Sequence, residues 1–221
     1  SVSLSMNPTF LDNHLKVQVN ANYAHEQNSY ADEGAIGSAV AFNPTQPVYD
    51  PNSPFGGFYE SYTANASPGS YTVYGPGNPL AMLEMRNNSA GSNRYYGNIQ
   101  LDYKIHGLED LHANLNLGYD VAKTTGRNFV NSNSVQSSLD KTFTGLGQGN
   151  TWNNLRRNHL LDFYMNYEKN IESIKSNFDI MAGYSWQHFY YANHDITYSN
   201  PTEDLGAKEG YTYDENERHY I

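Results

Sequence analysis

Residues 98–121 read NIQLDYKIHGLEDLHANLNLGYDV, and the rest of the chain repeats the pattern of this stretch. The odd positions from Ile99 to Ile105 and from Leu111 to Val121 are apolar, and the even positions are polar or glycine. Because successive side chains of a strand point to opposite faces, each arm is predicted to be a strand with one apolar and one polar face. Residues 107–110 make the turn. Each arm has roughly ten residues, enough to cross a bilayer at a tilt, so the stretch predicts a transmembrane β-hairpin.

The composition of the 221-residue chain is compatible with such a membrane protein. Apolar residues make up 38% of it, and no run of about 18 apolar residues exists to form a membrane helix. The mean hydropathy of -0.72 does not argue against strands in a membrane, because alternation hides apolar faces from an average. Twenty tyrosines against two tryptophans suit membrane-interface girdles and also carbohydrate-contacting loops.

Charge and cysteine content exclude several classes. The net charge of -10 argues against a nucleic-acid partner, which would require clustered Lys and Arg. The absence of cysteine rules out disulfides and thiolate metal sites. Residues 1–7 lack the basic and apolar regions of a signal peptide, so we expect either that one was removed or that the chain is an internal piece.

The alternating pattern recurs along the chain, with short and long connections in turn. A short turn falls at Leu11–Asn13 and another at Asn170–Lys175, and Pro8 favours an edge or bulged position for the first strand. Strands are expected near residues 2–10, 14–26, 95–106, 111–123, 158–169 and 176–190, and loops over 30–93, 124–154 and 191–221. In the first loop, Asn78 and Pro79 predict the N-cap and first turn of a short helix.

Short turns at one end and long loops at the other are typical of outer-membrane barrels. The predicted fold class is therefore all-β: an antiparallel up-and-down transmembrane β-barrel segment with long extracellular loops. Six strands do not close a barrel, because the smallest have about eight, and open edges are not tolerated in lipid. We expect the chain to be a fragment of a larger barrel that pairs with its remaining strands and contacts outer-membrane lipid.

Several segments, in the same order along the chain, resemble the SusC/RagA family of TonB-linked outer-membrane transporters of Bacteroidetes. The likeness runs from Val2 to about Tyr191 and rests on LDNHLKV (11–17), GAIG (34–37), FNPTQPVY (42–49), NPLAMLE (78–84), GNIQLDY (97–103) and NLNLGYD (114–120). The resemblance implies a plugged barrel of roughly 22 strands in the bacterial outer membrane. It also implies a SusD-like surface lipoprotein partner, energy from the TonB complex, and import of oligosaccharides or peptides. No plug domain, TonB box or closing strand is recognised, so contact with TonB is expected through parts missing from this chain.

The chain carries no pattern that predicts catalysis, a cofactor or a metal. His188 and His194 lie at a strand end and in a loop, where three or four converging ligands are not evident. The acidic stretches 50–53 and 214–217 do not match a calcium-binding loop. The carboxylate pair at Glu109 and Asp110 sits in a turn rather than in a cleft, so a glycosidase is not indicated. We therefore expect a protein that is not an enzyme.

Two sets of side chains are candidates for binding. Loop aromatics are expected to stack on sugars or a partner, or else to pack on one another: Tyr59, Tyr62, Tyr71 and Tyr74. Strand residues on the polar faces are expected to line the lumen of the barrel: Asn20, Asn22, Gln100, Asn114, Asn116 and Asn166. The alternative hypothesis is a soluble β-sheet module that binds carbohydrate or protein and buries the same apolar faces in a core.

Overall fold

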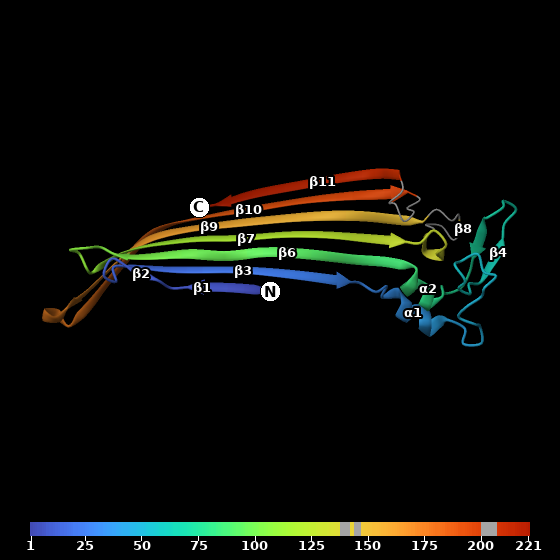
Figure 1. Ribbon diagram of the computed structural model, residues 1–221, viewed down its shortest axis with the longest axis horizontal. Helices are drawn as coiled ribbons and strands as arrows, with labels where there is room; N and C mark the ends of the chain where they lie inside the picture. Colours follow the sequence, from blue (N-terminus) through green and yellow to red (C-terminus); the bar gives the residue numbers. More distant parts are fainter. Residues whose placement is uncertain (138–141, 144–146, 200–206) are drawn as a thin grey trace.

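The computed structural model describes residues 1–137, 142–143, 147–199 and 207–221, and its main body is one antiparallel sheet (Figure 1). The strands run in the order β1-β3-β6-β7-β9-β10-β11, with β2 also paired to β3, so the order of strands across this sheet follows their order along the chain. The strands of the sheet are β1 (Val2–Met6), β2 (Thr9–Phe10), β3 (Leu15–Ser29), β6 (Arg86–Lys104), β7 (Leu111–Val130), β9 (Gln148–Ile171), β10 (Ser176–Ser199) and β11 (Ala207–Tyr220). The predicted all-β, up-and-down fold class is confirmed. Among the described residues, no helix is both long and apolar enough to span a membrane.

The register of the sheet places apolar residues opposite apolar residues. One such row crosses four strands. Val17 of β3 pairs with Leu101 of β6, and Leu101 pairs with Leu115 of β7. Leu115 in turn pairs with Phe163 of β9. Because side chains alternate along each strand, these rows lie on one side of the sheet, which we call the apolar face. The intervening residues, such as Gln18 and its cross-strand partners Gln100 and Asn116, lie on the other side, which we call the polar face.

The strands extend well beyond the ranges expected from the sequence. β6 begins at Arg86 and β7 ends at Val130, inside the predicted loops 30–93 and 124–154. The prediction of a loop over 191–221 is wrong, because β10 continues to Ser199 and β11 pairs with it over residues 207–220. The reason is that these extensions are mostly polar on both faces, with only isolated apolar residues such as Phe129 and Ile196. The alternation is then invisible, although the backbone hydrogen bonds of the ladder continue.

The two sides of the open sheet end on β1 and β11. Within the described residues, β1 pairs only with β3, and β11 pairs only with β10. Pro8 separates β1 from β2, in agreement with the edge position expected for a strand that contains a proline. The sheet is therefore not closed on itself.

All the short turns lie at one end of the sheet and the long connections at the other (Figure 1). The long connections form what we call the loop unit, residues 31–85 together with the described part of 131–143. It contains α1 (Gly34–Ala41), α2 (Pro79–Glu84) and η1 (Val135–Ser137), and a small sheet in the order β4 (Tyr62–Ala64), β5 (Tyr71–Val73), β8 (Thr142–Phe143). The remaining element, η2 (Glu172–Ile174), lies in the turn between β9 and β10.

The first helix of the loop unit was not predicted, whereas the second has the predicted cap. The side-chain oxygen of Asn78 accepts hydrogen bonds from the backbone N–H groups of Leu80 and Ala81, and Pro79 occupies the first turn. The Ser38 hydroxyl on α1 donates to the Gly77 carbonyl before α2, so the two helices are tied together.

Candidate binding surfaces

The six amide residues predicted to line a lumen share the polar face. A chain of side-chain hydrogen bonds crosses four strands there: Ser5 Oγ donates to Asn20, Asn20 Nδ2 donates to Asn98, and Asn98 Nδ2 donates to Asn116. The distances are 2.9, 3.0 and 3.0 Å. Asn20 and Asn98 each accept one of these hydrogen bonds and donate the next, whereas Asn116 accepts the last one. The ladder is therefore held in one orientation and still has hydrogen-bonding capacity for a polar partner.

The other four predicted lumen residues lie on the same face, at other register positions of the sheet. Asn22 Nδ2 donates to the Tyr96 carbonyl, and Gln100 lies opposite Asn116. Asn114 is buried, and Asn166 Nδ2 donates to Glu168 Oε1 at 2.7 Å. The register alone therefore brings all six to one surface, but it does not bring them into one cluster.

A charged pair that sequence analysis missed lies next to the amide ladder. The Arg94 guanidinium donates two hydrogen bonds to the Asp120 carboxylate, at 2.8 and 2.9 Å, and lies 4.7 Å from the centre of the Tyr96 ring. These groups and the ladder border a hollow of about 610 Å³ on the polar face. Amides, a fixed ion pair and an aromatic ring suit a hydroxyl-rich or peptide-like surface.

The loop tyrosines are divided between the interior and the surface of the loop unit. Phe55 is almost fully buried, and its ring contacts those of Tyr62 and Tyr71 with centroids 5.1 and 5.6 Å apart. Tyr59 is half-buried against Phe42, whereas 54% of the surface of Tyr74 is exposed. Of the four predicted residues, Tyr74 is thus the one most available to a ligand or partner, and binding by the set remains a prediction.

A buried carboxyl group lies beside the N-terminus of α2. Glu60 is 4% exposed, and its Oε1 accepts a hydrogen bond of 3.0 Å from the backbone N–H of Asn78. The Asn78 side chain in turn donates to the carbonyls of Val48 and Tyr59. Burial raises the pKa of Glu60 to about 7, although the hydrogen bond from Asn78 partly opposes this. Glu60 therefore changes charge near neutral pH.

A second carboxylate ties the loop unit to the sheet. Asp32 accepts hydrogen bonds from Arg86 Nη1 at 2.9 Å, Gln136 Nε2 at 2.7 Å and the Gly34 N–H at 2.9 Å. Burial by itself raises the pKa of Asp32, but these three donors outweigh it and hold the pKa below its ordinary value. Asp32 is thus a charged anchor where β6 enters the sheet.

The apolar face is exposed over a continuous band. Ile99, Leu117 and Phe163 keep 43%, 41% and 42% of their surface accessible, and none of the described segments covers them. On β7 the apolar side chains run from Leu111 to Val121, which matches the about 9–11 residues that a strand needs to cross a bilayer. Tyr23 and Tyr95 form a tilted ring pair at one border of this band, as aromatic girdles do.

An open antiparallel sheet with these two faces, short turns at one end and long loops at the other belongs to the class of transmembrane β-barrel segments. No family model matches the chain. A curated protein, the TonB-dependent receptor SusC of Bacteroides thetaiotaomicron, is 34% identical to it over 200 residues. The alignment covers 86% of this chain and 19% of that receptor. The chain therefore belongs to the SusC-like family of TonB-dependent receptors, and it spans about a fifth of the length of the relative it matches.

Proposed function

We propose that this chain forms part of the wall and the outer loops of a TonB-dependent transporter in the bacterial outer membrane. The observation that carries the proposal is the two-faced sheet: a band of exposed apolar side chains of membrane thickness backs onto a face of amides and charges. Side chains assigned to lipid are Leu15, Val17, Leu101, Leu115, Leu117 and Phe163, and the polar face lines the lumen.

The open edges of the sheet support its place in a larger barrel. Backbone groups on the free sides of β1 and β11 require partners inside a membrane, because no water is available there. In the complete receptor these partners are the remaining barrel strands. The similarity to SusC, which spans only part of that protein, agrees with this assignment.

The cargo we propose is an oligosaccharide or a peptide, delivered with a SusD-like surface lipoprotein. The amide ladder, the Arg94–Asp120 pair and Tyr96 offer the hydrogen bonds and ring surface that such cargo requires. The loop unit lies beyond the sheet at the end away from the short turns, where a lid or incoming cargo would meet it (Figure 1). Energy is proposed to come from the TonB complex, through parts of the receptor outside this chain.

Uptake measurements test the proposal. Cells that carry the complete receptor are given a panel of labelled oligosaccharides and peptides, with and without a functional TonB. We expect at least one cargo whose uptake requires TonB, and we expect the double substitution Arg94→Ala/Asp120→Ala to reduce that uptake. Lys123→Ala, an exposed change on the opposite side of the sheet, is the matched control and should leave uptake unchanged.

Two results would contradict the proposal. The first is equal uptake of every cargo in cells with and without TonB, which would exclude energised transport. The second is an isolated chain that stays monodisperse in buffer without detergent and melts cooperatively. That behaviour would show that the apolar face is buried in a soluble module.

A further inference from the structure

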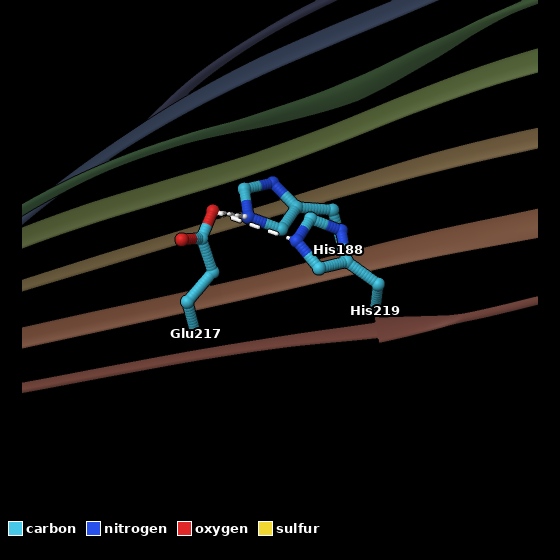
Figure 2. Close-up of side chains that lie close together, drawn as sticks. All are labelled: His188, Glu217 and His219. Carbon is cyan, nitrogen blue, oxygen red and sulfur yellow. Dashed lines mark hydrogen bonds and ion pairs between the residues drawn. The ribbon is translucent and has the colours of Figure 1, made fainter.

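Two histidines and a glutamate from the last two strands converge on the apolar face of the sheet (Figure 2). His188 of β10 lies opposite His219 of β11, and Glu217 precedes His219 by two positions, so all three side chains share one face. The Nε2 atom of His188 is 2.7 Å from Glu217 Oε1, and the Nε2 atom of His219 is 3.7 Å from the same oxygen. The three ligand atoms lie within 4.8 Å of one another.

These separations fit a common metal ion. With metal–ligand bonds of about 2.0–2.2 Å in a tetrahedral site, ligand atoms stand roughly 3.3–3.6 Å apart. The two measured distances, 2.7 and 3.7 Å, bracket that value, and Glu217 and His219 are exposed side chains that can rotate. The imidazole rings are nearly parallel, with centroids 4.6 Å apart and an angle of 9°, and both direct a nitrogen toward Glu217.

Neighbouring side chains hold the more buried ligand in place. Nδ1 of His159 on β9 lies 3.5 Å from Nδ1 of His188, on the side of the ring away from Glu217. A partner at Nδ1 fixes which nitrogen of a ligating histidine is free to bind metal. The Trp186 ring packs against His188 with centroids 5.8 Å apart. His188 is 17% exposed, whereas Glu217 and His219 are each 53% exposed. The register places the site level with Tyr119, at the aromatic border of the apolar band, where the lipid-facing surface meets water.

We propose that His188, Glu217 and His219 form a site for a divalent transition metal of the zinc type, with water in the fourth position. Two imidazoles and one carboxylate favour such ions, whereas calcium and magnesium take sets of oxygen ligands. The site connects β10 to β11, whose polar, acidic sequence has no apolar alternation to specify its register. A bound ion would therefore fix the pairing of these two strands. The inference stands on the three residues and does not depend on the transported cargo.

Cobalt provides a direct test, because tetrahedral coordination by nitrogen and oxygen gives visible absorption. The complete receptor, purified in detergent with a histidine-free affinity tag, is titrated with Co²⁺ and then with Zn²⁺ in competition with a chromophoric chelator. We expect one ion per receptor and displacement of cobalt by zinc. His188→Ala and His219→Ala should weaken binding by roughly 100-fold or more, and His159→Ala by about 10-fold, the scale of a supporting residue.

The matched control is His25→Ala, an exposed histidine on the same face of the same sheet, which should bind as the wild type does. Glu217→Gln keeps the shape of an exposed side chain and should also lose the cobalt spectrum, even if a histidine variant fails to fold. Thermal melts without metal verify folding. The proposal is overturned if the wild-type receptor shows no cobalt spectrum, or if the spectrum persists in a folded His188→Ala/His219→Ala double variant.

Discussion

In the loop unit Phe55 is 1% exposed and Val73 is 8% exposed, whereas in the sheet Ile99 and Phe163 keep more than two fifths of their surface accessible. The loop unit buries its apolar side chains against one another and so supplies its own core. The sheet presents its apolar side chains outward, and none of the segments that the structure describes forms a layer over them. Its stability therefore depends on the surrounding medium, and that of the loop unit depends on internal packing.

The largest effect is expected where the internal core is removed. Phe55→Ala leaves a cavity between Tyr62, Tyr71 and Val73, and a buried Phe→Ala change costs about 3–5 kcal/mol. We expect the loop unit to open while the sheet stays folded. Hydrogen exchange measured by mass spectrometry should show faster exchange over residues 42–85 and unchanged protection in β6 and β7.

Tyr74→Ala is the control, because this residue is exposed in the same segment. It should leave exchange in the loop unit nearly unchanged. Loss of protection throughout the sheet in Phe55→Ala would break the comparison, since it would show that the two regions unfold as one.

The next largest effect is expected from charge on the two faces of one strand. Leu115 points to the apolar face and Asn114 to the polar face of β7. Leu115→Arg should cost roughly 2–4 kcal/mol in a bilayer, and Asn114→Arg should be tolerated far better. The measurement is the free energy of unfolding of the complete receptor in liposomes. Equal sensitivity at the two positions would contradict the assigned faces.

The sequence predicts the part of the molecule whose physics is local. Ile99, Leu101 and their cross-strand partners alternate with polar residues because one face of each strand is apolar. The strands and their relative register could therefore be inferred from the sequence. The alternation of apolar and polar residues ends at the border of the apolar band toward the long loops. Beyond it, residues 148–154 of β9 pair with β7 and β10 through backbone hydrogen bonds, which a side-chain pattern does not show. The extent of the strands was underestimated for that reason.

The contacts that could not be predicted join residues without a shared local period. Phe55, Tyr62 and Val135 meet through the fold of two separate loops. The pairing of His188 with His219 requires β11, where apolar residues do not alternate with polar ones. Arg94 and Asp120 are the exception. Asp120 lies on the polar side of the predicted strand 111–123, and Arg94 directly precedes the predicted strand 95–106. Extending the register of the central hairpin by one residue would have placed the two diagonally across from each other.

A smaller effect, dependent on pH, is expected from Glu60 in the loop unit. Its ordinary pKa is 4.5, and burial raises it to about 7 in the folded state. The stabilising contribution of its proton is fully present below pH 4.5. It is lost as the pH rises to about 7, because the unfolded state releases the proton first. We expect the loop unit to lose roughly 1–3 kcal/mol between pH 5 and 8.

Glu60→Gln imitates the protonated form and should remove this dependence. Hydrogen exchange of residues 42–85, corrected for the intrinsic effect of pH, measures it in both proteins. Exchange in the sheet should show no such difference. A wild-type loop unit whose corrected protection is constant from pH 5 to 8 would show that Glu60 is solvated rather than buried.

The smallest effect is expected at the short-turn end, where neither an internal core nor lipid holds the chain. Leu11, Asp12 and Asn13 all have positive φ, of 56°, 51° and 70°, and Leu11 is 56% exposed. The left-handed conformation of a leucine costs about 1–2 kcal/mol of folded-state free energy. Glycine avoids this cost but loses more conformational entropy on folding, which offsets roughly 0.5–1 kcal/mol of the gain. Leu11→Gly should therefore stabilise the receptor by about 0.5 kcal/mol in liposome unfolding. Asn13→Gly should gain less, because asparagine already tolerates this conformation. If Leu11→Gly destabilises the receptor instead, the contacts of the leucine side chain stabilise the turn by more than the strain of its backbone destabilises it. The stability of the turn would then depend on lipid, as that of the sheet does.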